Sequence, residues 1–81
     1  MISEAQMRAG RALIEWSQQE LADKSGVSLP TIKRMEKVGP GRSAADTVLA
    51  VQKALEAAGV QFIPENGGGV GVRLAKPKGA E

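Results

Sequence analysis

The sequence predicts a mainly α-helical domain followed by a short C-terminal β-hairpin. Three observations support this fold class. Helix-capping signals recur along residues 3–46, apolar residues between them repeat every three or four positions, and the period changes to two after Gly59. With 81 residues, of which 42% are hydrophobic and many are alanine, the chain has enough large apolar side chains for one small core.

The composition argues against an enzyme, a metalloprotein and a membrane protein. The chain has no Cys and no His, so it lacks thiolate ligands and the commonest general base. The absence of Cys suits a reducing compartment, and we expect a cytoplasmic protein. No apolar stretch approaches the roughly 18 residues of a membrane span, and Met1–Glu4 does not open a signal peptide. We therefore expect no catalysis, no cofactor and no metal.

The first predicted helix begins after Ser3. Ser3 and Gln6 fit a capping box, in which the hydroxyl and the amide satisfy free N–H groups of the first turn. We expect this helix to continue to about Trp16, which we interpret as a core residue rather than a ligand-stacking group. Gly10 costs up to about 1 kcal/mol relative to Ala in a helix interior, and close packing is the one reason we can offer for it.

The second predicted helix follows at once. Ser17 and Glu20 form another capping box, so a helix begins at Gln18. It ends near Ser25, because Gly26 suits the left-handed position that follows a helix.

The third predicted helix carries basic residues. Ser28 is its N-cap candidate, and Pro30 lies in the first turn, where an N–H would lack an intrahelical partner. Ile32 and Met35, three positions apart, form its inner face. The basic side chains Lys33, Arg34 and Lys37 point elsewhere.

The fourth predicted helix starts after a loop. The segment Val38–Arg42 contains Gly-Pro-Gly and is interpreted as that loop. Ser43 and Asp46 offer one more cap of the same kind. The helix extends to about Ala58, and Gly59 ends it.

The last predicted elements are two strands. Val60–Ile63 and Val70–Leu74 alternate apolar and other residues around a glycine-rich turn that contains Asn66-Gly67. The glycine run is not a phosphate loop, because it lacks Lys-Ser/Thr and no helix follows it. Lys76–Glu81 has little to bury and is interpreted as a flexible tail.

Residues 18–37 read as a helix, a turn and a second helix that carries most of the local positive charge. Five basic residues face one acid between Lys24 and Arg42, although the net charge of the chain is only +2. DNA-binding helix-turn-helix motifs place the second helix in the major groove, with its N-terminal residues at the base edges. The basic cluster favours DNA binding over a helix-turn-helix that does not touch DNA and over an ordinary solvated helix face.

Two segments carry a resemblance to a known family. They are Arg11-Ala-Leu-Ile-Glu-Trp-Ser-Gln-Gln-Glu-Leu-Ala22 and Ser25-Gly-Val-Ser-Leu-Pro-Thr-Ile-Lys-Arg-Met-Glu36. Over residues 5–58 the chain resembles the Cro and phage-repressor type of helix-turn-helix regulator, the XRE family. The resemblance implies a four- to five-helix, phage-repressor-like domain that binds double-stranded operator DNA as a homodimer. The expected organisation is a DNA-binding domain over 1–58, a hairpin over 59–75 and a tail over 76–81.

The resemblance also assigns roles by position. The residues expected to face bases or the adjoining backbone are Ser28, Leu29, Pro30, Thr31 and Arg34. The residues expected to contact phosphates are Gln18, Lys33, Lys37 and Arg42. Arg34 is the best candidate for base readout, because its planar fork can hold guanine O6 and N7 together. Leu29 and Pro30 depart from the polar residues often found at these positions. Apolar side chains there can only contact thymine methyl groups or fill space, so we expect few bases to be read directly by side chains.

The resemblance further pairs Arg11 with Glu36. A bidentate guanidinium–carboxylate contact would fix how far the third helix projects from the first. The alternative is that both side chains are exposed and contribute about 0–1 kcal/mol.

The hairpin is the expected dimerisation element, because two strands are barely stable alone and leave open edges. Its apolar residues are Val60, Phe62, Val70, Val72 and Leu74, and we place the contact between copies on Val70–Leu74. The competing picture is a monomer whose hairpin folds back over its own fourth helix. The alternative function is an antitoxin-like module that neutralises a partner protein and binds DNA as well.

Overall fold

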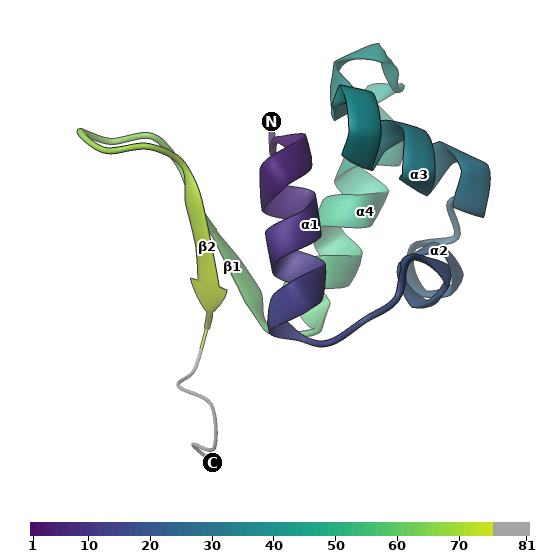
Figure 1. Ribbon diagram of the computed structural model, residues 1–81, viewed down its shortest axis with the longest axis horizontal. Coiled ribbons are helices and arrows are strands. Elements are labelled where there is room, and N and C mark those ends of the chain that lie inside the picture. The colour runs from purple at the N-terminus through teal and green to yellow at the C-terminus, as the bar shows by residue number, and fades with distance from the viewer. Residues whose placement is uncertain (76–81) are drawn as a thin grey trace.

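The computed structural model describes residues 1–75, in which four α-helices precede a two-stranded antiparallel hairpin (Figure 1). The elements are α1 (Glu4–Leu13), α2 (Gln18–Ser25), α3 (Leu29–Val38), the short 3₁₀ helix η1 (Pro40–Arg42), α4 (Ala45–Ala57), β1 (Val60–Ile63) and β2 (Gly71–Leu74). The predicted fold class, mainly helical with a C-terminal hairpin, is confirmed. The predicted tail at 76–81 lies outside the described residues.

Local capping chemistry sets the starts of the first three helices, as predicted. Ser3 Oγ accepts from the Gln6 N–H at 3.1 Å, and Gln6 Oε1 accepts from the Ser3 N–H at 2.9 Å. Ser17 and Glu20 repeat the same box at 3.0 and 2.9 Å. Ser28 caps α3 in turn, with Pro in its first turn. These starts are predictable because each cap lies within four residues of the helix that it begins.

Two predicted helix boundaries were wrong. Helix α1 ends at Leu13 rather than near Trp16, because Glu15 adopts a φ of 57° and the Trp16 N–H donates to the Arg11 carbonyl at 3.0 Å. Helix α4 is capped by Ala44 without a side-chain hydrogen bond, so the predicted Ser43 cap is absent.

Two smaller differences concern the segments around α4. Val38 belongs to α3, and the segment predicted as a loop ends in the helical turn η1. The second strand begins at Gly71 rather than at Val70.

The core lies between α1, α2, α3 and α4. Its largest fully buried side chains are Met7, Leu21, Ile32, Met35, Val51 and Leu55. Ile32 and Met35 form the inner face of α3 as predicted. Trp16 is half-buried and packs against this core from the loop that follows α1.

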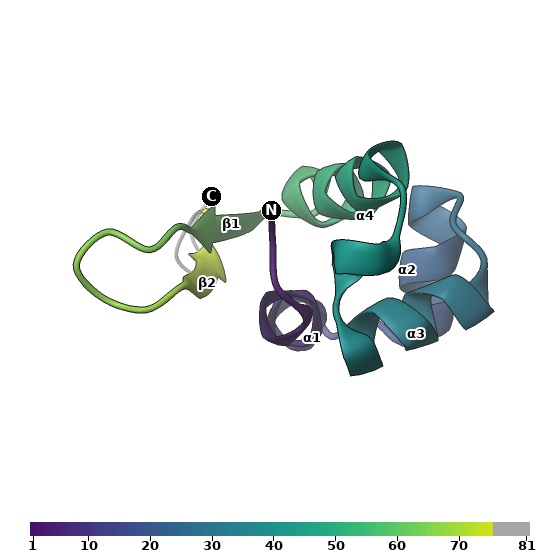
Figure 2. The same ribbon diagram turned by 90° about the horizontal axis from the view of Figure 1, so that it is seen from above.

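The hairpin lies against α1 and α4, at the end of the molecule opposite α2 and α3 (Figures 1 and 2). Val60 pairs with Leu74, and Phe62 pairs with Val72. A Cβ built on Gly10 of α1 would lie 3.3 Å from Val60 Cγ1 and 3.8 Å from Phe62 Cε1. The glycine inside α1 therefore allows the hairpin to approach the helix closely.

Some of the hairpin residues expected at a dimer contact pack against the helices of their own chain. Val60 is only 3% exposed, and the half-buried Phe62 and Val72 pack against the core. Within one copy, the side chains of these three residues are therefore wholly or partly covered by the helices. The sequence analysis also considered a monomer whose hairpin folds back over the fourth helix. In the structure, the hairpin contacts α4 and also α1, which that alternative did not include. Val70 is 48% exposed and Leu74 is half-buried.

Candidate DNA interface

Helices α2 and α3 form the helix-turn-helix. Gly26 follows α2 with a φ of 74°, and its N–H donates to the Ala22 carbonyl at 3.0 Å. Ser25 Oγ accepts from the Val27 N–H at 3.2 Å, which fixes the turn before α3 begins. The chain reverses within three residues because glycine adopts this left-handed conformation without steric cost.

Helix α3 divides into a buried face and an exposed face. Ile32 and Met35 are fully buried and hold the helix on the core. The exposed side chains at spacings of three and four form what we call the α3 stripe, which consists of Pro30, Lys33, Arg34 and Lys37. The stripe therefore presents three positive charges along one side of a helix that the core holds in place.

The N-terminus of α3 presents short polar side chains. Ser28 is exposed and Thr31 is half-buried, and the Ser28 hydroxyl donates to Thr31 Oγ1 at 2.9 Å. Leu29 is half-buried and packs against the hydrophobic core, which suits the space-filling role that the sequence left open for it.

Two further basic residues are Arg34, in the interior of α3, and Arg42, on the turn η1 between α3 and α4. Arg34 Nη2 donates to Ser43 Oγ at 3.4 Å, a long hydrogen bond, and Arg34 makes no ion pair within residues 1–75. Arg42 is exposed on η1. Both guanidinium groups are thus available to an anionic partner.

A network around Glu36 joins α1, α2 and α3. The Glu36 carboxylate is 4% exposed and accepts from Arg11 Nε at 2.6 Å and from Arg11 Nη2 at 2.7 Å. Arg11 Nη1 donates to the Trp16 carbonyl at 3.0 Å. The hydrogen bond to Glu36 raises the pKa of Arg11 and burial opposes it, so the guanidinium stays charged. The bidentate pair fixes the end of α3 against α1.

Gln18, expected at a phosphate, has its side chain in this same network. Its Nε2 donates to Glu36 Oε1 at 3.1 Å. Gln18 is also the first residue of α2, where backbone N–H groups lack intrahelical partners. In the structure, the side chain thus links the start of α2 to the end of α3.

Arg8 is a residue that the sequence analysis missed. Its Nη1 donates to the backbone carbonyl of Glu36 in the last turn of α3, where carbonyl groups lack intrahelical partners. Arg8 precedes Arg11 by three residues, so both side chains project from one face of α1. The spacing of three residues is therefore the sequence signal that could have placed Arg8 beside Arg11 at the end of α3.

The described part of the chain offers neither a membrane span nor a metal site. None of the helices within residues 1–75 is long and apolar enough to cross a bilayer. The same residues contain no group of three or more His, Cys, Asp or Glu side chains that could hold a metal ion.

The geometry defines a helix-turn-helix domain whose second helix, α3, presents an exposed basic face. A family model described as helix-turn-helix matches residues 7–60, which is more than half of the chain. The chain therefore belongs to the XRE-type helix-turn-helix family, a family of DNA-binding regulatory domains and not of enzymes. A search of curated proteins found no match.

Proposed function

We propose that this protein is a transcriptional regulator that recognises operator DNA sequence-specifically as a homodimer. The observation that carries the proposal is the α3 stripe, whose three cations project from a helix held on the core and at its C-terminal turn. Ile32 and Met35 bury its inner face, and the Arg11–Glu36 pair holds its C-terminal turn. A rigid, convex and basic helix suits insertion into the major groove.

Roles within this interface follow from exposure and chemistry. Lys33, Lys37 and Arg42 neutralise phosphates, and Gln18 contributes the N-terminal N–H of α2 to the same backbone. Arg34 reads a base, because an exposed guanidinium can hold guanine O6 and N7 together. The short side chains of Ser28 and Thr31, with Pro30, meet the neighbouring base edges or backbone. Few side chains of α3 are long enough to read bases, so sequence preference rests mainly on Arg34.

The second copy joins through the outer edge of β2. In an antiparallel hairpin, the backbone N–H groups along one strand point alternately toward the partner strand and away from it. The Ala75 N–H points toward the first strand, because it donates to the Gly59 carbonyl at 2.7 Å. By that alternation, the N–H groups of Val72 and Leu74 point away from β1 and are open to another strand. The molecule is 33 Å long, and the hairpin and α3 lie at opposite ends (Figure 1). Two copies joined at their hairpins therefore carry their α3 helices at the outer ends of the dimer. A spacing of about 34 Å, one turn of B-DNA, requires that the two copies meet at an angle rather than in line.

The recognition claim is tested by selecting bound duplexes from a random library. We expect enrichment of an inverted repeat whose half-sites are centred about 10 base pairs apart. Enrichment of single half-sites would contradict the dimer, and no enrichment over several rounds would contradict sequence-specific recognition.

The dimer claim is tested by sedimentation velocity on Val70→Lys. Val70 is 48% exposed next to β2, and a lysine at an open edge opposes strand pairing. Leu49→Lys is the matched control, because Leu49 is 46% exposed but lies on α4. We expect a monomer for Val70→Lys and a dimer for Leu49→Lys and the wild type. A wild-type monomer at micromolar concentration, or a dimeric Val70→Lys, would contradict the proposed contact.

A further inference from the structure

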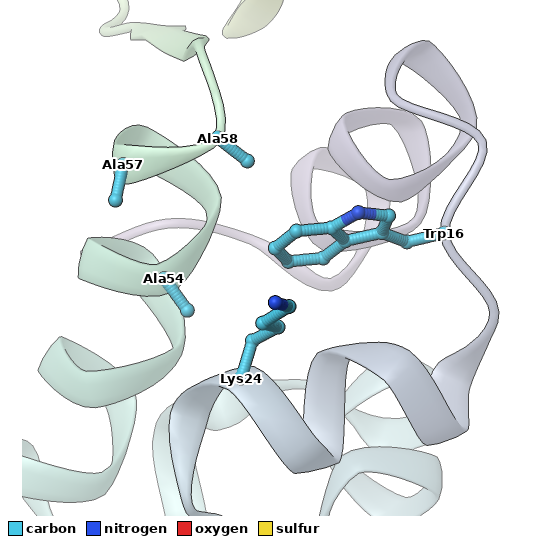
Figure 3. A pocket seen from close by; sticks show the side chains of 5 residues that line it. All are labelled: Trp16, Lys24, Ala54, Ala57 and Ala58. Atoms are coloured by element: carbon cyan, nitrogen blue, oxygen red, sulfur yellow. The ribbon is translucent and has the colours of Figure 1, made fainter.

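A groove outside the DNA interface lies between α4, α2 and the loop that carries Trp16 (Figure 3). It encloses about 350 Å³ and is lined by Trp16, Lys24, Ala54, Ala57 and Ala58. This volume lies in the lower part of the range found for small-molecule sites. We propose that this groove binds a planar aromatic carboxylate.

The walls of the groove suit a flat apolar group. The indole of Trp16 reaches from its loop toward α4, and the methyl groups of Ala54 and Ala58 point toward it from α4 (Figure 3). Alanines leave room beside the indole that larger side chains would fill. An aromatic ring in this space would stack on the indole and lose its apolar surface to the methyl groups.

The charge in the groove identifies the polar group of the ligand. Lys24 rises from α2 toward the indole and is the one ionisable residue in the lining (Figure 3). It makes no ion pair within residues 1–75. Glu20, one helical turn away, already accepts the Ser17 N–H at 2.9 Å in the capping box of α2. A carboxylate is therefore the complementary group, held by a charge-assisted hydrogen bond beside the stacked ring.

The groove also adjoins the network that holds the recognition helix. The Trp16 carbonyl accepts from Arg11 Nη1 at 3.0 Å, and Arg11 binds Glu36 at the end of α3. A ligand that shifts Trp16 acts on this network, so its occupancy changes DNA affinity. This coupling rests on the proposed function, whereas binding of the ligand does not.

The binding claim is tested by NMR titration with 2-naphthoate, and with 2-naphthamide as the uncharged probe of the same shape. We expect saturable shifts centred on the groove residues and affinity for the carboxylate about tenfold above that for the amide. Lys24→Met should abolish the preference, Ala58→Leu should block both probes by filling the groove, and Lys53→Met on exposed α4 should change neither. Equal affinity for the two probes, shifts centred elsewhere, or no saturation at millimolar concentration would overturn the site.

The coupling claim is tested with a duplex obtained by the selection above. Saturating 2-naphthoate should change its dissociation constant by about threefold or more in the wild type and not in Ala58→Leu. An unchanged constant with the groove occupied would overturn the coupling. Because the NMR titration contains no DNA, loss of the binding site and loss of the proposed function are separate results.

Discussion

The carboxylate of Glu36 in α3 accepts two hydrogen bonds from the guanidinium of Arg11 in α1, at 2.6 and 2.7 Å. Glu36 is 4% exposed, so water cannot replace Arg11 as its partner without opening the structure. The pair connects two helices that are 25 residues apart in the chain. It thereby makes the position of the recognition helix depend on the first helix.

Arg11→Ala should lower the free energy of unfolding by about 3 kcal/mol, because it leaves a buried carboxylate without its cation. Arg11→Lys should fall between this variant and the wild type, since lysine keeps the charge but loses the bidentate geometry. Urea denaturation measures both, with Arg42→Ala on exposed η1 as the control. A loss below about 1 kcal/mol for Arg11→Ala would mean that the pair behaves as a surface ion pair.

Gly10→Ala should stabilise the protein only when Val60 is shortened. Alanine gains about 1 kcal/mol of helix propensity over glycine, but its Cβ would lie 3.3 Å from Val60 Cγ1. We therefore expect almost no change in the wild type and a gain of about 1 kcal/mol in a Val60→Ala background. The double-mutant cycle is measured by thermal or urea unfolding. Equal effects in both backgrounds would show that the hairpin does not press on α1.

The sequence predicted those features that depend on neighbouring residues. The caps at Ser3, Ser17 and Ser28 and the turn at Gly26 are local, so the sequence alone identified them. Family resemblance, rather than local pattern, brought Arg11 and Glu36 together.

The features that sequence reasoning missed depend on contacts between distant segments. Helix α1 ends early where the loop carrying Trp16 folds back onto Arg11. The amide of Gln6 caps α1 and also donates to the carbonyl groups of Ile63 and Gly71 in the hairpin. No pattern within α1 signals these strand contacts, so the docking of the hairpin on α1 was not predicted.

Lys37→Ala should flatten the salt dependence of DNA binding. Each neutralised phosphate contributes about 0.9 to the slope of log K against log salt concentration on B-DNA, so the slope should fall by about that amount per subunit. The fall should be the same on selected and random duplexes, because a phosphate contact carries no sequence information. Lys53→Ala, exposed on α4, is the control. An unchanged slope would remove Lys37 from the interface.

Arg34→Ala should weaken binding to the selected duplex by about 1–3 kcal/mol and relax the preference at one base pair of each half-site. Binding to random DNA should weaken less. Fluorescence anisotropy with the selected duplex and its single-base variants measures both effects. Equal losses on selected and random DNA would make Arg34 a phosphate contact.

The most direct test of the DNA-binding face compares two triple variants of equal charge. One removes the cations of the α3 stripe (Lys33→Ser, Arg34→Ser, Lys37→Ser), and the other removes three cations that lie outside both α3 and the hairpin (Lys24→Ser, Lys53→Ser, Lys78→Ser). Both change the net charge by the same amount, so general attraction to DNA falls equally. Dissociation constants for the selected duplex are measured at one salt concentration. The α3 variant should lose about 100-fold or more in affinity, and the other about fivefold or less. Equal losses would contradict recognition through α3.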